Sequence, residues 1–345
     1  MKIGLLTYHY SMNYGAVLQA YATYRALREL GHEVELINIR QDERKKGRSF
    51  IFHWKKKAFD DFYKRFYPHQ SELFKDILSL RNANLDYDCL MVGSDQTWNP
   101  RISCEKMMAY FLDFGPRNVI RISYAASIGQ EEWPEEHIKD IPQIKEALSK
   151  FNAISVRENT ANRILHDVFS LDSTVVVDPT LLHEDYNEIT GPIKPNDEVV
   201  CYILNRIPSV LQQAKKLCQY IGKKGKMIST IRPVPGFSYV YPPSIESWIK
   251  YIAGAKFVIT DSFHGVAFCL IYKKNFVVIT VDNGRNSRMK DLMDKVGLSD
   301  RFFHGSDNID FGMLLNTPID YVSVYKNLGR ESSWEFLRKN LNSVR

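Results

Sequence analysis

Residues 257–266 combine side chains that can bind an anion with one that can transfer a proton. The apolar run 257–260 predicts a strand that ends at Asp261 and Ser262, and an apolar helix is expected to begin near His264. Asp261 can cap that helix, and Ser262 can hold an anion together with the free amides of the first turn. A bound anion would favour the charged form of His264, which the helix dipole alone disfavours. We interpret His264 as a candidate acid–base group, the alternative being a buried imidazole of the core.

A second polar segment, residues 93–98, follows the buried strand expected over residues 89–92. Asp95 and Gln96 can hydrogen-bond sugar hydroxyls, and Trp98 can stack on the apolar face of a sugar ring. The alternative is an aspartate that caps a helix beside a tryptophan of the core. We favour a carbohydrate site, because four hydrogen-bonding side chains in succession are unusual for a simple turn.

Arginines follow two other predicted strands. Arg157 comes directly after the run 153–156, and Arg285 and Arg288 come after the run 276–281. A guanidinium in these places can hold a carboxylate or a phosphate through two parallel hydrogen bonds. For Arg157 the alternative is a surface ion pair with its neighbour, which has little energetic consequence.

The first predicted strand, residues 2–7, is followed by a segment that is typical of a helix start. Asn13 can cap the helix expected over residues 14–30, and Gly15 allows the backbone to approach a ligand closely. The amides of the first turn can then bind an anion. A helix cap without a ligand has the same pattern, so this segment is a weak indication by itself.

A framework of parallel strands has to position these segments. Short apolar runs alternate with amphipathic stretches along the chain, which predicts parallel sheets with helices on both faces. We expect a Rossmann-like domain over residues 1–187, a second one over residues 188–323, and a closing helix within 324–345 that packs back on the first domain. The polar segments would then lie at the carboxyl ends of the strands and face a cleft between the domains.

Five motifs, taken in this order, resemble the polysaccharide pyruvyl transferase family. They are Asn13-Tyr14-Gly15-Ala16…Gln19, Gly93-Ser94-Asp95-Gln96…Trp98, Ser155-x-Arg157-Glu158, Asp178-Pro179-Thr180 and Asp261-Ser262-Phe263-His264-Gly265. The resemblance spans residues 3–300 and implies a two-domain fold similar to that of the GT-B glycosyltransferases. It also implies phosphoenolpyruvate as the donor and a hydroxyl pair on a sugar of a bacterial surface glycan as the acceptor. Some members have Arg-Leu-His where this chain has Ser262-Phe263-His264, so Arg157, Arg285 or Arg288 is expected to supply the missing charge.

The resemblance also implies roles for single residues. Ketal formation needs a proton for the methylene carbon of phosphoenolpyruvate, which is expected from His264, and Asp95 is a candidate base. The residues expected to bind the donor are Arg157, Asp261, Ser262, Phe263, Gly265, Arg285 and Arg288. The residues expected to bind the acceptor are Asn13, Tyr14, Gly15, Gln19, Ser94, Gln96 and Trp98. No cofactor and no metal are expected, because acidic residues do not cluster with histidine at ligand spacing.

The composition is that of an ordinary globular protein, with 345 residues of which 44% are hydrophobic and 25% charged. The five cysteines lie far apart, and no apolar run approaches the roughly 20 residues that a membrane span needs. The first residues are too polar for a signal peptide. We therefore expect a reduced, cytoplasmic protein.

The positive charge is concentrated in one stretch. Ten basic and four acidic residues lie between Arg40 and Arg65, so this stretch carries the whole net charge of +6, and six aromatic residues interleave with the cations. Such a segment suits a peripheral contact with the inner face of a membrane, or a lipid-linked substrate. The alternative is a solvated helix whose aromatic rings pack inward. Nucleic acid is not expected as a partner, because no recognition motif accompanies the charge.

Two functions compete with pyruvyl transfer. A glycosyltransferase of the same fold would use a nucleotide sugar and would need carboxylates that bind a ribose. A non-catalytic accessory protein would bind a glycan or a lipid through the basic stretch. The order of the five motifs favours the pyruvyltransferase over both.

Overall fold

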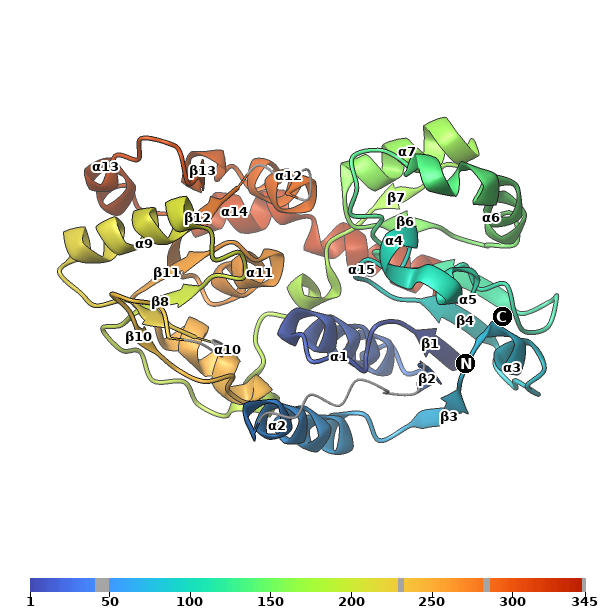
Figure 1. The fold of residues 1–345 in the computed structure, drawn as a ribbon. Coiled ribbons are helices and arrows are strands. Elements are labelled where there is room, and N and C mark those ends of the chain that lie inside the picture. Colours follow the sequence, from blue (N-terminus) through green and yellow to red (C-terminus); the bar gives the residue numbers. More distant parts are fainter. Residues whose placement is uncertain (41–49, 229–232, 282–285, 343–345) are drawn as a thin grey trace. The chain divides into compact units, whose positions relative to one another are not determined.

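The computed structural model describes residues 1–40, 50–228, 233–281 and 286–342. The chain divides into two compact units. The first comprises Met1–Lys46, Tyr63–Leu182 and Gly329–Arg345, and the second comprises Gly47–Phe62 and His183–Leu328. Each unit contains parallel strands with intervening helices (Figure 1), so the predicted α/β class is confirmed. The cleft expected between the two domains stays a prediction.

The first unit is built on a five-stranded parallel sheet in the order β3-β2-β1-β4-β5. Its strands are β1 (Lys2–Leu6), β2 (Glu33–Ile39), β3 (Gln70–Phe74), β4 (Cys89–Val92) and β5 (Ile120–Ser123). The central strands are apolar and buried, as expected where helices cover both faces of a parallel sheet. The strand order reverses between β1 and β4, and open α/β sheets bind ligands at such a point.

A two-stranded parallel sheet adjoins this first sheet. Its strands are β6 (Ser155–Val156) and β7 (Thr174–Val175). Backbone bridges join Ala126, which follows β5, to both Asp95 and Val156. The segments that follow β4, β5 and β6 therefore lie side by side at the carboxyl ends of their strands.

The second unit is built on a six-stranded sheet in the order β10-β9-β8-β11-β12-β13. Its strands are β8 (Val199–Tyr202), β9 (Lys226–Met227), β10 (Ser238–Tyr239), β11 (Phe257–Thr260), β12 (Asn275–Thr280) and β13 (Phe302–His304). All the pairings are parallel, and Thr260 pairs with Tyr202 on one side and with Val278 on the other. The loops after β8, β11 and β12 therefore leave the same edge of this sheet.

Helices connect the strands of both units. In the first unit these include α1 (Tyr14–Glu29), α3 (Ile77–Arg81), α4 (Pro100–Ser103), η1 (Cys104–Lys106), α5 (Met107–Tyr110), η2 (Glu135–Asp140), α6 (Ile141–Leu148), α7 (Asn159–Phe169) and η3 (Pro179–Leu182). In the second unit they include α8 (Asn187–Thr190), α9 (Pro208–Ile221), α10 (Ile245–Gly254), α11 (Phe263–Ile271), α12 (Ser287–Lys295), η4 (Ser299–Arg301) and α13 (Phe311–Asn316). None of the helices in the described part of the chain has the length and hydropathy of a membrane-spanning segment.

The basic stretch contains α2 (Phe50–Phe66), drawn in blue in Figure 1. Phe59, Phe62 and Tyr63 are buried, whereas Trp54 is exposed. For these three rings the interpretation that the aromatic residues pack inward is confirmed. Arg44, Lys45, Lys46 and Arg48 lie outside the described residues.

The chain closes with two helices instead of the single helix that the sequence predicts. They are α14 (Tyr321–Leu328) in the second unit and α15 (Arg330–Asn342) in the first. Gly329 separates them with a φ of +79°, a left-handed conformation that favours glycine. In α15 the Ser333 hydroxyl accepts the Val177 amide at 3.0 Å, and the Arg330 Nε donates to the Leu181 carbonyl at 2.8 Å.

Candidate functional site

The loop after β11 is tied to the loop after β8 by side chains. The Asp261 carboxylate accepts hydrogen bonds from the backbone amides of Leu204 at 2.6 Å and Asn205 at 2.7 Å. The Thr260 hydroxyl donates to the Tyr202 carbonyl at 2.7 Å. Burial raises the pKa of Asp261, although the two amides act in the opposite direction. The prediction that Asp261 binds the donor is corrected, because both of its oxygens already hold the neighbouring loop.

His264 lies in the first turn of α11, directly beyond the carboxyl end of β11, and is buried. Ser262 is the N-cap, and its hydroxyl accepts the Gly265 amide at 3.4 Å. A Cβ atom on Gly265 would lie 2.3 Å from the Thr260 hydroxyl oxygen, so only glycine allows the helix to start this close to the strand. Gly265 therefore has a packing role, and its contact with the donor stays a prediction. The ring of Phe263 meets the His264 ring edge-on at 5.3 Å between centroids.

Two cations accompany His264 at this edge of the second sheet. Arg288 is partly buried in the first turn of α12, which follows β12. Arg206 is partly buried in the loop after β8, and burial lowers the pKa of its guanidinium. Arg285 lies outside the described residues. Sequence analysis missed Arg206, although it follows a predicted strand just as Arg157 and Arg288 do.

The first unit holds a buried cluster of charges around Arg157. The Arg157 side chain is 1% exposed, and its Nη1 lies 2.6 Å from Oδ2 of Asp178. Its Nη2 lies 3.8 Å from Asp95 and its Nε 3.8 Å from Glu158. Burial lowers the pKa of Arg157, but the three carboxylates outweigh burial and raise it. The prediction that Arg157 projects outward to bind the donor is wrong, because three carboxylates already offset its charge.

Hydrogen bonds reach both oxygens of Asp178 and one oxygen of Glu158. Asp178 accepts from the hydroxyls of Ser94 at 3.1 Å and Thr180 at 2.6 Å. Glu158 accepts from the Ser127 hydroxyl at 2.8 Å and from the backbone amides of Ile128 and Gly129, each at 3.1 Å. Ser94 is buried by these contacts, so it supports the cluster and does not face an acceptor, contrary to the prediction.

Asp95 is the member of the cluster that reaches the surface, with 20% of its side chain exposed. Its φ of +70° is left-handed, which is uncommon for a residue other than glycine. The Asp95 carbonyl accepts the amides of Thr97 at 2.7 Å and Ser127 at 3.0 Å, and these bonds hold the strained turn. Gln96 is partly exposed beside it. Among the residues predicted to act on an acceptor, Asp95 and Gln96 are therefore well placed.

Three other predicted acceptor residues belong to the core. Trp98 is fully buried, donates from Nε1 to the Tyr110 carbonyl at 2.9 Å and stacks on Phe111, so the prediction that it forms a sugar platform is wrong. Tyr14 is buried on α1. Gln19 is also buried, and its Nε2 donates to the Thr7 hydroxyl at 2.9 Å, so neither side chain is open to a ligand.

The start of α1 is a capped helix end. The Asn13 Oδ1 accepts the amides of Gly15 at 2.9 Å and Ala16 at 3.4 Å. These are first-turn amides that were expected to bind an anion. Because the cap occupies them, the interpretation of Asn13 and Gly15 as an anion site is corrected. The exposed Asn13 side chain still lies near the point between β1 and β4 where the strand order reverses.

Aromatic residues after β1 form a surface that sequence analysis did not assign to the acceptor. Tyr10 is partly exposed, the Arg40 guanidinium lies 3.6 Å from its ring centroid, and the Tyr63 ring lies 4.8 Å away. Tyr8 is partly exposed beside the Tyr110 ring, at 4.8 Å. These rings follow β1, the strand next to β4. Asp95 was identified because it follows the carboxyl end of a strand, and the same criterion could have identified these rings.

His9 in the same loop is a buried, neutral imidazole. Its Nδ1 lies 3.1 Å from the Thr7 carbonyl, and burial together with Arg40 lowers its pKa to about 4, against the opposing effect of the Thr7 hydrogen bond. His9 therefore carries no charge near neutral pH. In the unfolded chain it takes up a proton near pH 6.5.

This difference predicts an acid-sensitive contribution to stability. As the pH falls, His9 takes up a proton in the unfolded chain before it does so in the folded protein. Its contribution to the free energy of unfolding is therefore complete above pH 6.5 and is lost towards pH 4. Between pH 7 and pH 5 the loss is about 2 kcal/mol. We expect His9→Gln to remove this part of the decline in the free energy of unfolding, measured by urea unfolding at pH 7 and pH 5. His166→Gln is the control, because the Asp167 hydrogen bond raises the pKa of His166, and it should leave the decline undiminished.

Comparisons with known proteins place these features in a family context. Residues 13–283 match the family model described as polysaccharide pyruvyl transferase. No curated protein sequence matches the chain. Within the described residues, no group of three or more histidine, cysteine or acidic side chains is placed to hold a metal ion.

Solved structures with the same fold include an epimerase and two transferases. The UDP-GlcNAc 2-epimerase from Neisseria meningitidis has a TM-score of 0.61 at 11% identity, and the match covers 99% of this chain and 100% of that one. The spinosyn forosaminyltransferase SpnP has a TM-score of 0.54 at 12% identity, covering 100% and 99%. The spinosyn rhamnosyltransferase SpnG has a TM-score of 0.51 at 11% identity, covering 99% and 100%. The predicted GT-B-like fold is therefore confirmed, and identities this low show the fold alone.

Proposed function

The chain belongs to the polysaccharide pyruvyl transferase family, and on that premise we propose that it transfers pyruvate from phosphoenolpyruvate to a sugar of a bacterial surface polysaccharide or of its lipid-linked precursor. The product is a pyruvate ketal, and phosphate is released. The observation that carries the proposal is the edge of the second sheet, where His264, Arg206 and Arg288 follow three adjacent parallel strands.

The donor chemistry suits this edge. Phosphoenolpyruvate carries a carboxylate and a phosphate, and guanidinium groups bind both kinds of anion. Arg206 and Arg288 supply the positive charge that the family pattern leads one to expect at Ser262. Their position supports a donor site on the second unit that does not use Arg157.

The reaction has two stages, in which atoms and charges balance. A proton is added to the methylene carbon of phosphoenolpyruvate, and a sugar hydroxyl attacks the adjacent carbon and loses its proton to a base. The bond from that carbon to the phosphate oxygen then breaks, and phosphate leaves with one proton. A second hydroxyl of the sugar attacks the same carbon and loses its proton. The two protons lost by the hydroxyls thus replace the one that His264 gives to the methylene carbon and the one that leaves with phosphate. His264 gives the first proton, and the cations stabilise the departing phosphate.

Asp95 is the proposed base for the acceptor hydroxyls. Its carboxylate reaches the surface of the first unit, and Arg157 lies behind it at 3.8 Å. We propose that Arg157 positions Asp95. Gln96 and the Tyr10 ring are proposed to contact the acceptor sugar, in place of the buried Trp98.

A phosphate-release assay tests the proposed function. The wild-type protein is mixed with phosphoenolpyruvate and a panel of bacterial surface glycans and lipid-linked oligosaccharides. We expect acceptor-dependent phosphate release and a product heavier than the acceptor by the mass of the ketal. Parallel reactions contain UDP- and TDP-sugars instead of phosphoenolpyruvate. Sugar transfer in those reactions alone would establish the glycosyltransferase, and binding of glycans without either reaction would establish an accessory protein.

A further inference from the structure

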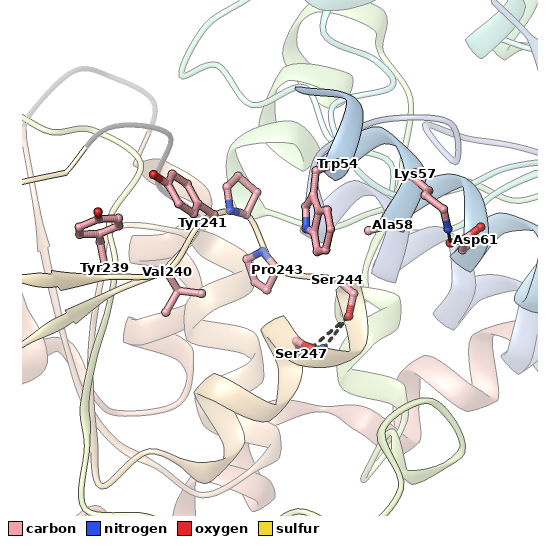
Figure 2. Close-up of a pocket in the computed structure, with 11 residues that line it drawn as sticks. Trp54, Lys57, Ala58, Asp61, Tyr239, Val240, Tyr241, Pro243, Ser244 and Ser247 are labelled. Atoms are coloured by element: carbon pink, nitrogen blue, oxygen red, sulfur yellow. Dashed lines mark hydrogen bonds and ion pairs between the residues drawn. The ribbon is translucent and has the colours of Figure 1, made fainter. Parts of the chain in front are cut away.

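The second unit contains a groove that the proposed reaction does not use. It lies between the first turns of α2 and the segment from the end of β10 to the start of α10, and its volume is about 1020 Å³. Figure 2 shows Trp54 on one side and Tyr239 and Tyr241 on the other, with Pro243 between them. A volume of this size suits a ligand of several rings.

The aromatic side chains of the groove are exposed to water. Trp54 is 60% exposed, Tyr241 48% and Tyr239 43%, whereas Phe59 and Phe62 on the same α2 helix are buried. The Tyr239 and Tyr241 rings are nearly perpendicular, with centroids 5.6 Å apart. Large aromatic side chains gathered around one open groove indicate a binding surface, because single exposed apolar residues are normally scattered.

Polar groups lie among these rings. Lys57 Nζ is 2.7 Å from the Asp61 carboxylate, one helical turn further along α2. The Ser244 hydroxyl caps α10 and hydrogen-bonds Ser247. A sugar matches such a lining, because its apolar C–H face stacks on an aromatic ring while its hydroxyls reach serine, lysine and carboxylate groups at the edges. A hydrocarbon chain would form no hydrogen bonds with these polar groups.

The charge of α2 specifies the ligand further. Residues 53–66 contain five basic and two acidic side chains, and because Lys57 is paired with Asp61 in the groove itself, the excess comes from the rest of the helix. This excess attracts an anionic ligand. Among the rings of the helix, Phe59, Phe62 and Tyr63 are buried in the protein, so these three are not available to a lipid bilayer.

We propose that this groove binds an anionic glycan, namely the part of the acceptor that lies outside the sugar to be pyruvylated. The inference rests on the proposed function for the identity of that glycan as the acceptor. Trp54 and Tyr241 stack on its sugar rings, and the positive charge of α2 attracts its acidic groups. The groove thereby selects the acceptor polymer without taking part in the chemistry.

Binding without phosphoenolpyruvate tests the groove directly. The probe is a tetragalacturonate, and its fully methyl-esterified form has the same rings without the charge. Tryptophan fluorescence reports binding, because Trp98 and Trp248 are fully buried and Trp54 is exposed. We expect the acidic form to bind more tightly than the esterified form. Trp54→Ala and Tyr241→Ala should each weaken binding of the acidic form about tenfold, as measured by calorimetry. Tyr220→Ala is the matched control, because this tyrosine on α9 is 60% exposed outside the groove, and it should bind like the wild type.

Three results would overturn the inference: no binding of either oligosaccharide by the wild type, unchanged affinity in both groove variants, or binding only to phosphatidylglycerol vesicles. Circular dichroism melts confirm that the variants fold. In the pyruvyl-transfer assay, Trp54→Ala should raise the KM for an acidic glycan acceptor and leave kcat and the KM for phosphoenolpyruvate unchanged. If the wild type releases no phosphate with any acceptor, the proposed function fails, whereas the binding result stands by itself.

Discussion

Replacement of Arg157 by glutamine should lower the free energy of unfolding of the first unit by about 3–5 kcal/mol. The guanidinium is buried among Asp178, Asp95 and Glu158, and glutamine removes its positive charge while the three carboxylates stay. Carboxylates that remain in a site of low dielectric without their cation repel one another and cannot regain the hydration they lose on folding. This is the largest stability effect that we expect from a single side chain of the site.

Urea unfolding measures this effect against a matched control. Arg101→Gln is the same substitution at an ion pair with Glu136 of equal length, 2.6 Å, in which both side chains are about half exposed. It should cost far less, because solvent screens an exposed ion pair. In the double variant Arg157→Gln with Asp178→Asn, part of the loss should be recovered, because one of the unpaired carboxylates is gone. Equal losses for Arg157→Gln and Arg101→Gln would refute the description of the cluster as a buried, interdependent set of charges.

Replacement of His264 by glutamine should lower kcat for phosphate release by about 10²–10⁴-fold. Glutamine keeps a polar side chain of similar size in the first turn of α11, but it cannot give a proton to the methylene carbon of phosphoenolpyruvate. The two backbone amides held by Asp261 and the Ser262 cap do not involve this side chain, so the fold around it should persist.

Steady-state kinetics and thermal melts together test the role of His264. The expected result is a lower kcat at a melting temperature within a few degrees of the wild type. His166→Gln, on an exposed histidine of the first unit, should leave kcat unchanged. A His264→Gln enzyme that turns over within a factor of three of the wild type would remove the proposed acid from the mechanism.

Local sequence patterns predicted the central strands and most of the long helices. β4 and β11 are short, wholly apolar runs bounded by polar turns, and the structure finds them at Cys89–Val92 and Phe257–Thr260. β3, β10 and β13 were not predicted. They are strands at the edges of their sheets, and β3 (Gln70–Phe74) has exposed polar residues because it has a neighbouring strand on one side only.

The segments that follow the strands were also predicted, but the direction of each side chain was not. Trp98 and Gln19 point into the core, whereas Tyr10 and Asp95 reach the surface. A residue's place after a strand depends on local backbone preferences, which the sequence contains. Its exposure depends on which distant segments pack around it, such as Tyr110 against Trp98 or Thr7 against Gln19.

The chain's order of motifs by itself determined the family, the α/β class and the positions at which polar loops leave the strands. Only the tertiary structure decided that Arg157 is enclosed by Asp178, Asp95 and Glu158, and that Arg206 lies at the same sheet edge as His264. The physical reason is that strand and helix formation depends on neighbours along the chain, whereas the burial and pairing of a charge depend on groups that may be more than 50 residues away, as Arg157 and Asp95 illustrate.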